Sequence, residues 1–148
     1  MSSYRQILYH LIFRTRAGQR TLSVEDNSEL YAYIGGIIKN KKCHLYRING
    51  MPDHIHILSD LHPNIALADL MRDIKTSTSF WLKGNSMYPK FNGWASGYAA
   101  LTYSMKEKDR LIEYIKNQQV HHRRVAFEKE YRKFIIEAGI QIDERFFP

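Results

Sequence analysis

The sequence predicts an α+β fold of the ferredoxin-like (split βαβ) type, in which one antiparallel sheet carries two helices on one face. Hydrophobic periodicity changes along the chain in the order strand, helix, strand, strand, helix, strand, which is the element order of this fold. The chain has 148 residues and 44% of them are hydrophobic, which is typical of one compact domain. Since no linker divides it, we expect a single domain over residues 1–148, with a core of about residues 1–122 and a C-terminal helix and tail over about 123–148.

The first half of the chain is expected to form a strand, a helix and a hairpin. Residues 4–15 are rich in aromatic and branched side chains, which favour a strand. A helix near residues 24–41, preceded by Ser23, is predicted by apolar side chains at helical spacing: Leu30, Ile34, Ile37 and Ile38. Residues 43–49 and 54–61 predict two strands, and the turn NGMPD between them indicates a hairpin.

The second half predicts two further helices around a fourth strand, and then a short C-terminal helix. Asn64 can cap a helix that ends near residues 84–85, and residues 94–104 predict a strand. A third helix is expected over residues 106–122 and a short amphipathic helix around 128–138. The first two helices leave the other face of the sheet available, and the third helix can pack across it.

Charge and composition favour a nucleic-acid partner. Lys and Arg number 22 against 15 Asp and Glu, which gives a net charge of +7 and a pI near 9.5. A polyanion binder has this character, although many basic proteins are merely soluble, so charge alone leaves both readings open. Cys43 is the single cysteine, and neither a membrane-length apolar run nor a secretory signal is found. We therefore expect a cytoplasmic protein with no membrane partner.

Two histidines lie one residue apart in the strand-like stretch MPDHIHIL. Because side chains alternate along a strand, Ile55 and Ile57 are predicted to point into the core, while His54 and His56 project together from the opposite, exposed face. Two adjacent imidazoles can share a metal ion. They are also compatible with ordinary surface histidines, because an H-x-H triplet is common by chance.

A tyrosine and a glutamine lie one turn apart in the predicted third helix. Tyr114 and Gln118 share a face, beside an apolar stripe that includes Leu111 and Ile115. If this helix packs across the open face of the sheet, the pair approaches the histidines. Otherwise Tyr114 is a boundary aromatic and Gln118 a solvated polar residue, and helix geometry alone leaves both possibilities open.

Together these motifs resemble the single-tyrosine HUH nucleases, and more specifically the IS200/IS605-type and REP-associated tyrosine transposases. The resemblance rests on MPDHIHIL, the Lys75-bearing second helix, WASGYAALTYS, YIKNQQVHH and FEKEYRKFIIEAGIQIDERFF, and so covers most of the chain. It implies that His54 and His56 are metal ligands, that Gln118 is the third ligand, and that Tyr114, on a catalytic helix after the fourth strand, is the nucleophile.

The resemblance further implies a metal-dependent transposase that acts on single-stranded DNA. Tyr114 would attack a phosphodiester to give a 5′-phosphotyrosine and a free 3′-hydroxyl, followed by rejoining through transesterification. The expected cofactor is Mg²⁺ or Mn²⁺. No nucleotide cofactor is expected, because the phosphodiester energy is retained and no G-x-x-x-x-G-K-[ST] motif is present.

The expected partners are hairpin-bearing single-stranded ends of a mobile element in a bacterial or archaeal cell, and a second copy of the chain. The resemblance implies a homodimer in which each tyrosine acts on the partner's histidines, whereas the spacing alone leaves cis and trans sites open. The linker at residues 121–124 is a solvated basic corner, a hinge or a DNA contact. Candidate DNA contacts are the basic residues Arg14, Arg16, Arg20, Lys39, Lys41, Lys42, Lys75, Arg123 and Arg124.

Three alternative functions are considered. A non-catalytic RRM-like nucleic-acid-binding protein has the same scaffold, but it leaves both residue pairs unexplained and no RNP1-like run is present. An HUH replication or relaxase-type nicking endonuclease shares the constellation, but the chain is small and has no helicase segment. A histidine-triad hydrolase would need a third histidine, and position 58 is Leu. The remaining candidates, His10, His44 and His62, are expected to be structural or surface residues.

Overall fold

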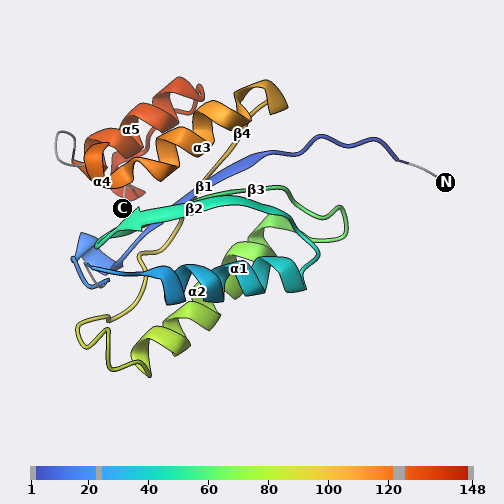
Figure 1. Cartoon of the computed structure of the whole chain (residues 1–148). Helices are drawn as coiled ribbons and strands as arrows, with labels where there is room; N and C mark the ends of the chain where they lie inside the picture. Colours follow the sequence, from blue (N-terminus) through green and yellow to red (C-terminus); the bar gives the residue numbers. More distant parts are fainter. Residues whose placement is uncertain (1–2, 23–24, 122–125, 147–148) are drawn as a thin grey trace.

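A four-stranded antiparallel sheet forms the centre of the molecule. The computed structural model describes residues 3–22, 25–121 and 126–146. The strands are β1 (Tyr9–Arg14), β2 (Leu45–Met51), β3 (His54–Ser59) and β4 (Ala99–Thr102), in the spatial order β2-β3-β1-β4 (Figure 1). Every pairing is antiparallel, and the sheet order is that of the split βαβ arrangement. The predicted fold class is confirmed.

Helices cover both faces of this sheet (Figure 1). On one face lie α1 (Ser28–Asn40) and α2 (Leu67–Lys83), and on the other lie α3 (Lys108–Lys116), α4 (Gln118–His121) and α5 (Phe127–Glu137). Short 3₁₀ turns occupy Arg16–Gly18, Met105–Glu107 and Glu144–Phe146. Among the described residues, none of the helices combines the length and the apolar character that a membrane crossing requires.

Alternation along the strands divides the buried side chains between the two faces. Ile55 and Ile57 of β3 belong to the main core, which lies between the sheet and α1 and α2. Leu58 packs with Leu111 and Ile115 of α3, and Ile12 of β1 packs with residues of α5. The third helix therefore does pack across the face that the first two helices leave available.

Several elements are shorter than the sequence predicts. The first strand starts at Tyr9, because its pairing with β3 and β4 ends there. The fourth strand covers only Ala99–Thr102, since Gly97 has a φ of 81°, outside extended backbone, and Trp94 forms only an isolated bridge with Thr15. The first helix begins at Ser28, and the predicted start near Ser23 lies outside the described residues.

The third helix is interrupted rather than continuous. It ends at Lys116, and α4 follows after Asn117. Asn49 of β2 donates through Nδ2 to the carbonyl oxygens of Ile115 and Lys116, at 3.0 and 3.1 Å. These contacts satisfy carbonyl groups that a continuing helix would have bonded to its next turn. The amphipathic C-terminal helix, by contrast, is found within one residue of its predicted bounds.

Candidate functional site

The two histidines of β3 are covered by α3, α4 and α5. His54 and His56 point to the same side of the sheet, as the alternation predicts, but both are fully buried. The expectation that this face is exposed is wrong. The ring of Phe127, at the start of α5, stacks on His54 with 4.2 Å between ring centroids and 24° between ring planes.

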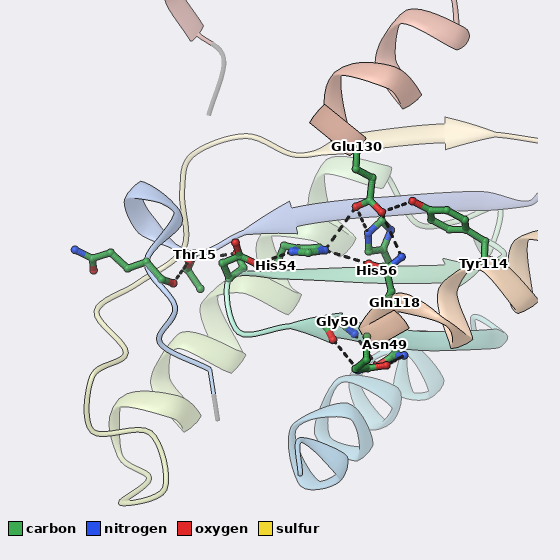
Figure 2. Close-up of polar contacts among 11 residues, drawn as sticks. Thr15, Asn49, Gly50, His54, His56, Tyr114, Gln118 and Glu130 are labelled. Carbon is green, nitrogen blue, oxygen red and sulfur yellow. Dashed lines mark hydrogen bonds and ion pairs between the residues drawn. The ribbon is translucent and has the colours of Figure 1, made fainter. Parts of the chain in front are cut away.

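Two polar side chains, those of Gln118 and Glu130, converge at the Nε2 atoms of the histidines (Figure 2). Gln118 Oε1 lies 3.2 Å from His54 Nε2, and Glu130 Oε1 lies 2.9 Å from His56 Nε2 and 3.6 Å from His54 Nε2. One ligand atom from each of His54, His56 and Glu130 lies within 4.8 Å of the others. An octahedral ion with bonds of about 2.1 Å keeps neighbouring ligand atoms about 3 Å apart and opposite ones about 4 Å apart. The donor set therefore suits a divalent ion.

Outer hydrogen bonds orient both imidazoles. Asp53 Oδ1 lies 2.7 Å from His54 Nδ1, and His10 Nε2 lies 2.7 Å from His56 Nδ1. If each Nδ1 carries the proton and donates to these acceptors, each Nε2 keeps its lone pair for a metal, a common arrangement around metal-binding histidines. Burial is the main cause that lowers the pKa of His10 well below its ordinary value, so His10 is neutral and able to accept. His10, which was expected to be a structural or surface residue, therefore contacts the site through His56.

Tyr114 points toward the same cluster from α3 (Figure 2). Its hydroxyl donates to Glu130 Oε2, and its ring lies 6.1 Å from that of His56. Burial raises the pKa of Tyr114 above its ordinary value, and the hydrogen bond to Glu130 raises it further. The phenol is thus protonated at neutral pH in the absence of a bound cation. Beside it opens a cavity of about 270 Å³, lined by Tyr114, Glu130 and the cations Arg110, Lys129 and Lys133 among others.

The junction between α3 and α4 positions Gln118. Besides its bonds to the end of α3, Asn49 exchanges hydrogen bonds with Gln119, at 3.1 and 3.0 Å. Gln119 Nε2 also donates to the carbonyl oxygen of Gly50 at 3.0 Å. Since Gln118 directly precedes Gln119, fixing this turn to β2 holds the Gln118 amide over His54.

The basic residues predicted to contact DNA do not form one patch. Arg14 lies opposite His54 in the sheet register. The charge of Arg20 contributes to lowering the pKa of Asp53, which precedes His54. Arg14 and Arg20 therefore lie near the site. Lys39 lies in the last turn of α1 and the lysines at positions 41 and 42 follow it, at the opposite end of the sheet, where Lys41 pairs with Asp73. Lys75 donates to the carbonyl oxygens of residues 95 and 97. Arg123 and Arg124 lie outside the described residues.

Four of the clustered residues were predicted from the sequence, and three others were not. His54, His56, Tyr114 and Gln118 are all in the cluster, whereas Glu130, Asp53 and His10 were not predicted. Asp53 was detectable, because a carboxylate directly before an H-x-H triplet can support a histidine ligand. His10 gave no signal in the sequence, since its contact depends on the pairing of β1 with β3.

The chain is similar to known transposases. A family model described as "Transposase IS200 like" matches residues 3–118. The ISDra2 transposase TnpA of Deinococcus radiodurans is 25% identical over 120 residues, which cover 76% of this chain and 84% of that protein.

Two solved structures resemble the chain. A crystal structure of a candidate transposase from Deinococcus radiodurans R1 matches with a TM-score of 0.58 and 25% identity, over 80% of this chain and 95% of that one. A REP-associated tyrosine transposase bound to a REP hairpin matches with a TM-score of 0.62 over 82% of this chain and 74% of that one; at 18% identity it shows the fold alone. Because the family match covers most of the 148 residues, this chain belongs to the IS200-like transposases, a family of enzymes that cleave and join DNA.

Proposed function

We propose that the protein is a metal-dependent transposase that cleaves single-stranded DNA through Tyr114. The tyrosine oxygen attacks a DNA phosphorus and displaces the 3′-oxygen, so a 5′-phosphotyrosine forms and a 3′-hydroxyl is released. A second 3′-hydroxyl then attacks the phosphotyrosine, joins the strands and returns the phenol. The observation that carries this proposal is the convergence of the Tyr114 hydroxyl, the histidine pair and Gln118 in one buried cluster.

His54, His56 and Gln118 would hold the divalent ion, Mg²⁺ or Mn²⁺. When bound, the ion supplies positive charge that polarises the scissile phosphate and stabilises the leaving oxygen. Imidazole nitrogens favour Mn²⁺ over Mg²⁺, so we expect tighter binding of Mn²⁺. The protein side chains contribute orientation: Asp53 and His10 fix the imidazoles, and the packing of α3 on the sheet fixes the position of the phenol.

The DNA substrate we propose is single-stranded and bears a hairpin, as the REP hairpin bound by the structural neighbour suggests. The cavity next to Tyr114, with three cations in its lining, is a suitable route for a phosphate to reach the hydroxyl. Within one chain Tyr114 already faces its own histidine pair, which favours a cis site in each protomer of a homodimer. Mixing Tyr114→Phe with His56→Ala protein tests this point, because only trans sites would restore activity in the mixture.

The direct test is covalent capture of DNA. Wild-type protein incubated with Mn²⁺ and labelled single-stranded hairpin ends should give a labelled protein band that survives denaturation, and Tyr114→Phe should give none. Tyr98→Phe is a matched control, because this half-buried tyrosine packs on Lys75 away from the histidine pair. A wild-type protein that forms no adduct, or a Tyr114→Phe protein that forms as much as wild type, would exclude the proposal.

A further inference from the structure

Glu130 is a charged side chain that is almost completely excluded from water. Its exposed fraction is 2%, and it lies on α5, whose other site-facing residues are the aromatic Phe127, Tyr131 and Phe134. A carboxylate in such a position is costly unless strong partners compensate for its lost hydration. The identity of those partners therefore indicates what the carboxylate is for.

The two carboxylate oxygens of Glu130 face different functional groups (Figure 2). Oε1 lies against the Nε2 atoms of His56 and His54, at 2.9 and 3.6 Å. Oε2 accepts from the Tyr114 hydroxyl and lies 3.4 Å from Gln118 Nε2. One oxygen is thus placed among the proposed metal ligands and the other at the proposed nucleophile.

Oε1 of Glu130 lies where a metal ligand would lie. Both histidine Nε2 atoms, which must be unprotonated to bind a metal, point at this oxygen, and that of His54 also lies next to Gln118 Oε1. A carboxylate added to two imidazoles and an amide supplies the anionic oxygen that Mg²⁺ and Mn²⁺ prefer. With Gln118, the set comprises two nitrogen and two oxygen donors, and an octahedral ion would retain two positions for water and phosphate.

Helix α5 is docked so that this contact is held in place. The ring of Phe127 stacks on His54, and Arg14 lies over the same Phe127 ring at 5.7 Å. Seven residues further along, Phe134 meets the ring of Tyr114 edge-on, with 5.3 Å between centroids, and that of His10 at 4.9 Å. Both ends of this face of α5 therefore contact the site, and Glu130 lies between them.

We infer that Glu130 is a fourth ligand of the same divalent ion and that its second oxygen positions the Tyr114 hydroxyl, so that α5, which lies beyond the family match at residues 3–118, completes the active site. This inference rests on the proposed function, because it concerns the same metal and the same nucleophile. It assigns to the C-terminal helix a part in metal binding, and not only in covering the sheet.

Manganese binding to the full chain tests the ligand role, measured by titration calorimetry without DNA. Glu130→Gln keeps the size of the side chain and removes its charge. It should weaken Mn²⁺ binding at least about tenfold, because even the loss of a residue that only hydrogen-bonds to a ligand weakens metal binding about 10- to 100-fold. Glu128→Gln is the matched control: it lies on the same helix, exposed and paired with Arg132, and should bind Mn²⁺ as wild type does.

Hydrogen exchange on the wild-type protein gives a second measurement that does not depend on a variant folding. Mn²⁺ should slow the exchange of α5 backbone amides, because the ion would tie α5 to β3. Wild-type Mn²⁺ affinity in Glu130→Gln, unchanged exchange in α5, or no Mn²⁺ binding by wild-type protein would each overturn the assignment.

The ligand assignment of Glu130 and the proposed function can be refuted independently of each other. If Glu130→Gln binds Mn²⁺ normally while wild-type protein still forms a Tyr114-dependent DNA adduct, the ligand assignment is lost and the proposed function stands. If Mn²⁺ binding depends on Glu130 but no adduct forms with any single-stranded substrate, the ligand assignment stands and the proposed function is lost.

Discussion

Replacing Asp53 by Asn should weaken metal binding without unfolding the protein. Burial raises the pKa of Asp53, but the hydrogen bond with His54 and further electrostatic contacts outweigh this effect, so the pKa lies below the ordinary value and Asp53 is ionised at neutral pH. The carboxylate, 2.7 Å from His54 Nδ1, accepts only from the tautomer that leaves Nε2 free for a metal. An Asn amide can accept from Nδ1–H or donate to an unprotonated Nδ1, so it no longer selects between the tautomers.

The size of this effect follows from the contact that is lost. Changes to the outer partner of a histidine ligand weaken metal affinity about 10- to 100-fold, which is about 1.4 to 2.7 kcal/mol. The change in the free energy of unfolding without metal should be smaller, because the Asp53 side chain is 22% exposed and Asn keeps its shape.

Titration calorimetry with Mn²⁺ is the assay for this prediction. Asp69→Asn is the matched control, because Asp69 is an exposed carboxylate on α2 whose partner is Arg72. Equal Mn²⁺ affinities for wild type and Asp53→Asn would refute the reasoning that an ionised carboxylate fixes the tautomer of His54. An equally large loss of Mn²⁺ affinity in Asp69→Asn would show that the effect comes from the net charge of the protein and not from the contact with His54.

Three further predictions concern the scaffold. Gly50→Ala should lower the free energy of unfolding, measured in urea, by about 1–3 kcal/mol, because its Cβ would lie 2.3 Å from the His54 carbonyl oxygen; Gly36→Ala, with open space in α1, should be neutral or stabilising. Asn49→Ala should cost about 1–3 kcal/mol in the same measurement and weaken Mn²⁺ binding, because the carbonyl groups at the end of α3 lose their donor. Tyr31→Phe should reduce the loss of stability on raising the pH from 10 to 12: burial raises the pKa of Tyr31 from 10.0 to about 12, so the phenol ionises first in the unfolded chain, and stability present below pH 10 is lost as the pH rises.

The fold was predictable because its signals are local. The alternation of His54, Ile55, His56 and Ile57 assigns two side chains to each face of β3, and the structure has the isoleucines in the core and the histidines together on the other side. The four-residue spacing of Tyr114 and Gln118 directs them to one side even though the helix is interrupted between them. Patterns of this kind depend on backbone geometry alone, which the sequence determines directly.

The burial of the histidines and the interruption of the third helix depend on contacts between distant segments. Asn49 holds the end of α3 from a position 66 residues away in the sequence, and no local pattern predicts this contact. The face that carries His54 and His56 appeared free because two helices already accounted for the other face of the sheet. It is closed by α3, α4 and α5, and no local pattern predicts the placement of α5.

Glu130, like Asp53, is a missed residue that the sequence could have indicated. Phe127, Tyr131 and Phe134 are spaced by four and three residues and form one stripe of the C-terminal helix. Glu130 falls inside this stripe, three residues after the first aromatic and four before the last, whereas Glu128 falls outside it. A glutamate that shares the buried face of an amphipathic helix needs a compensating partner, and in a basic chain that also carries an H-x-H triplet the most suitable partner is a shared cation. In a chain with an H-x-H triplet, a charged residue inside an apolar helix stripe is therefore a candidate for a further metal ligand.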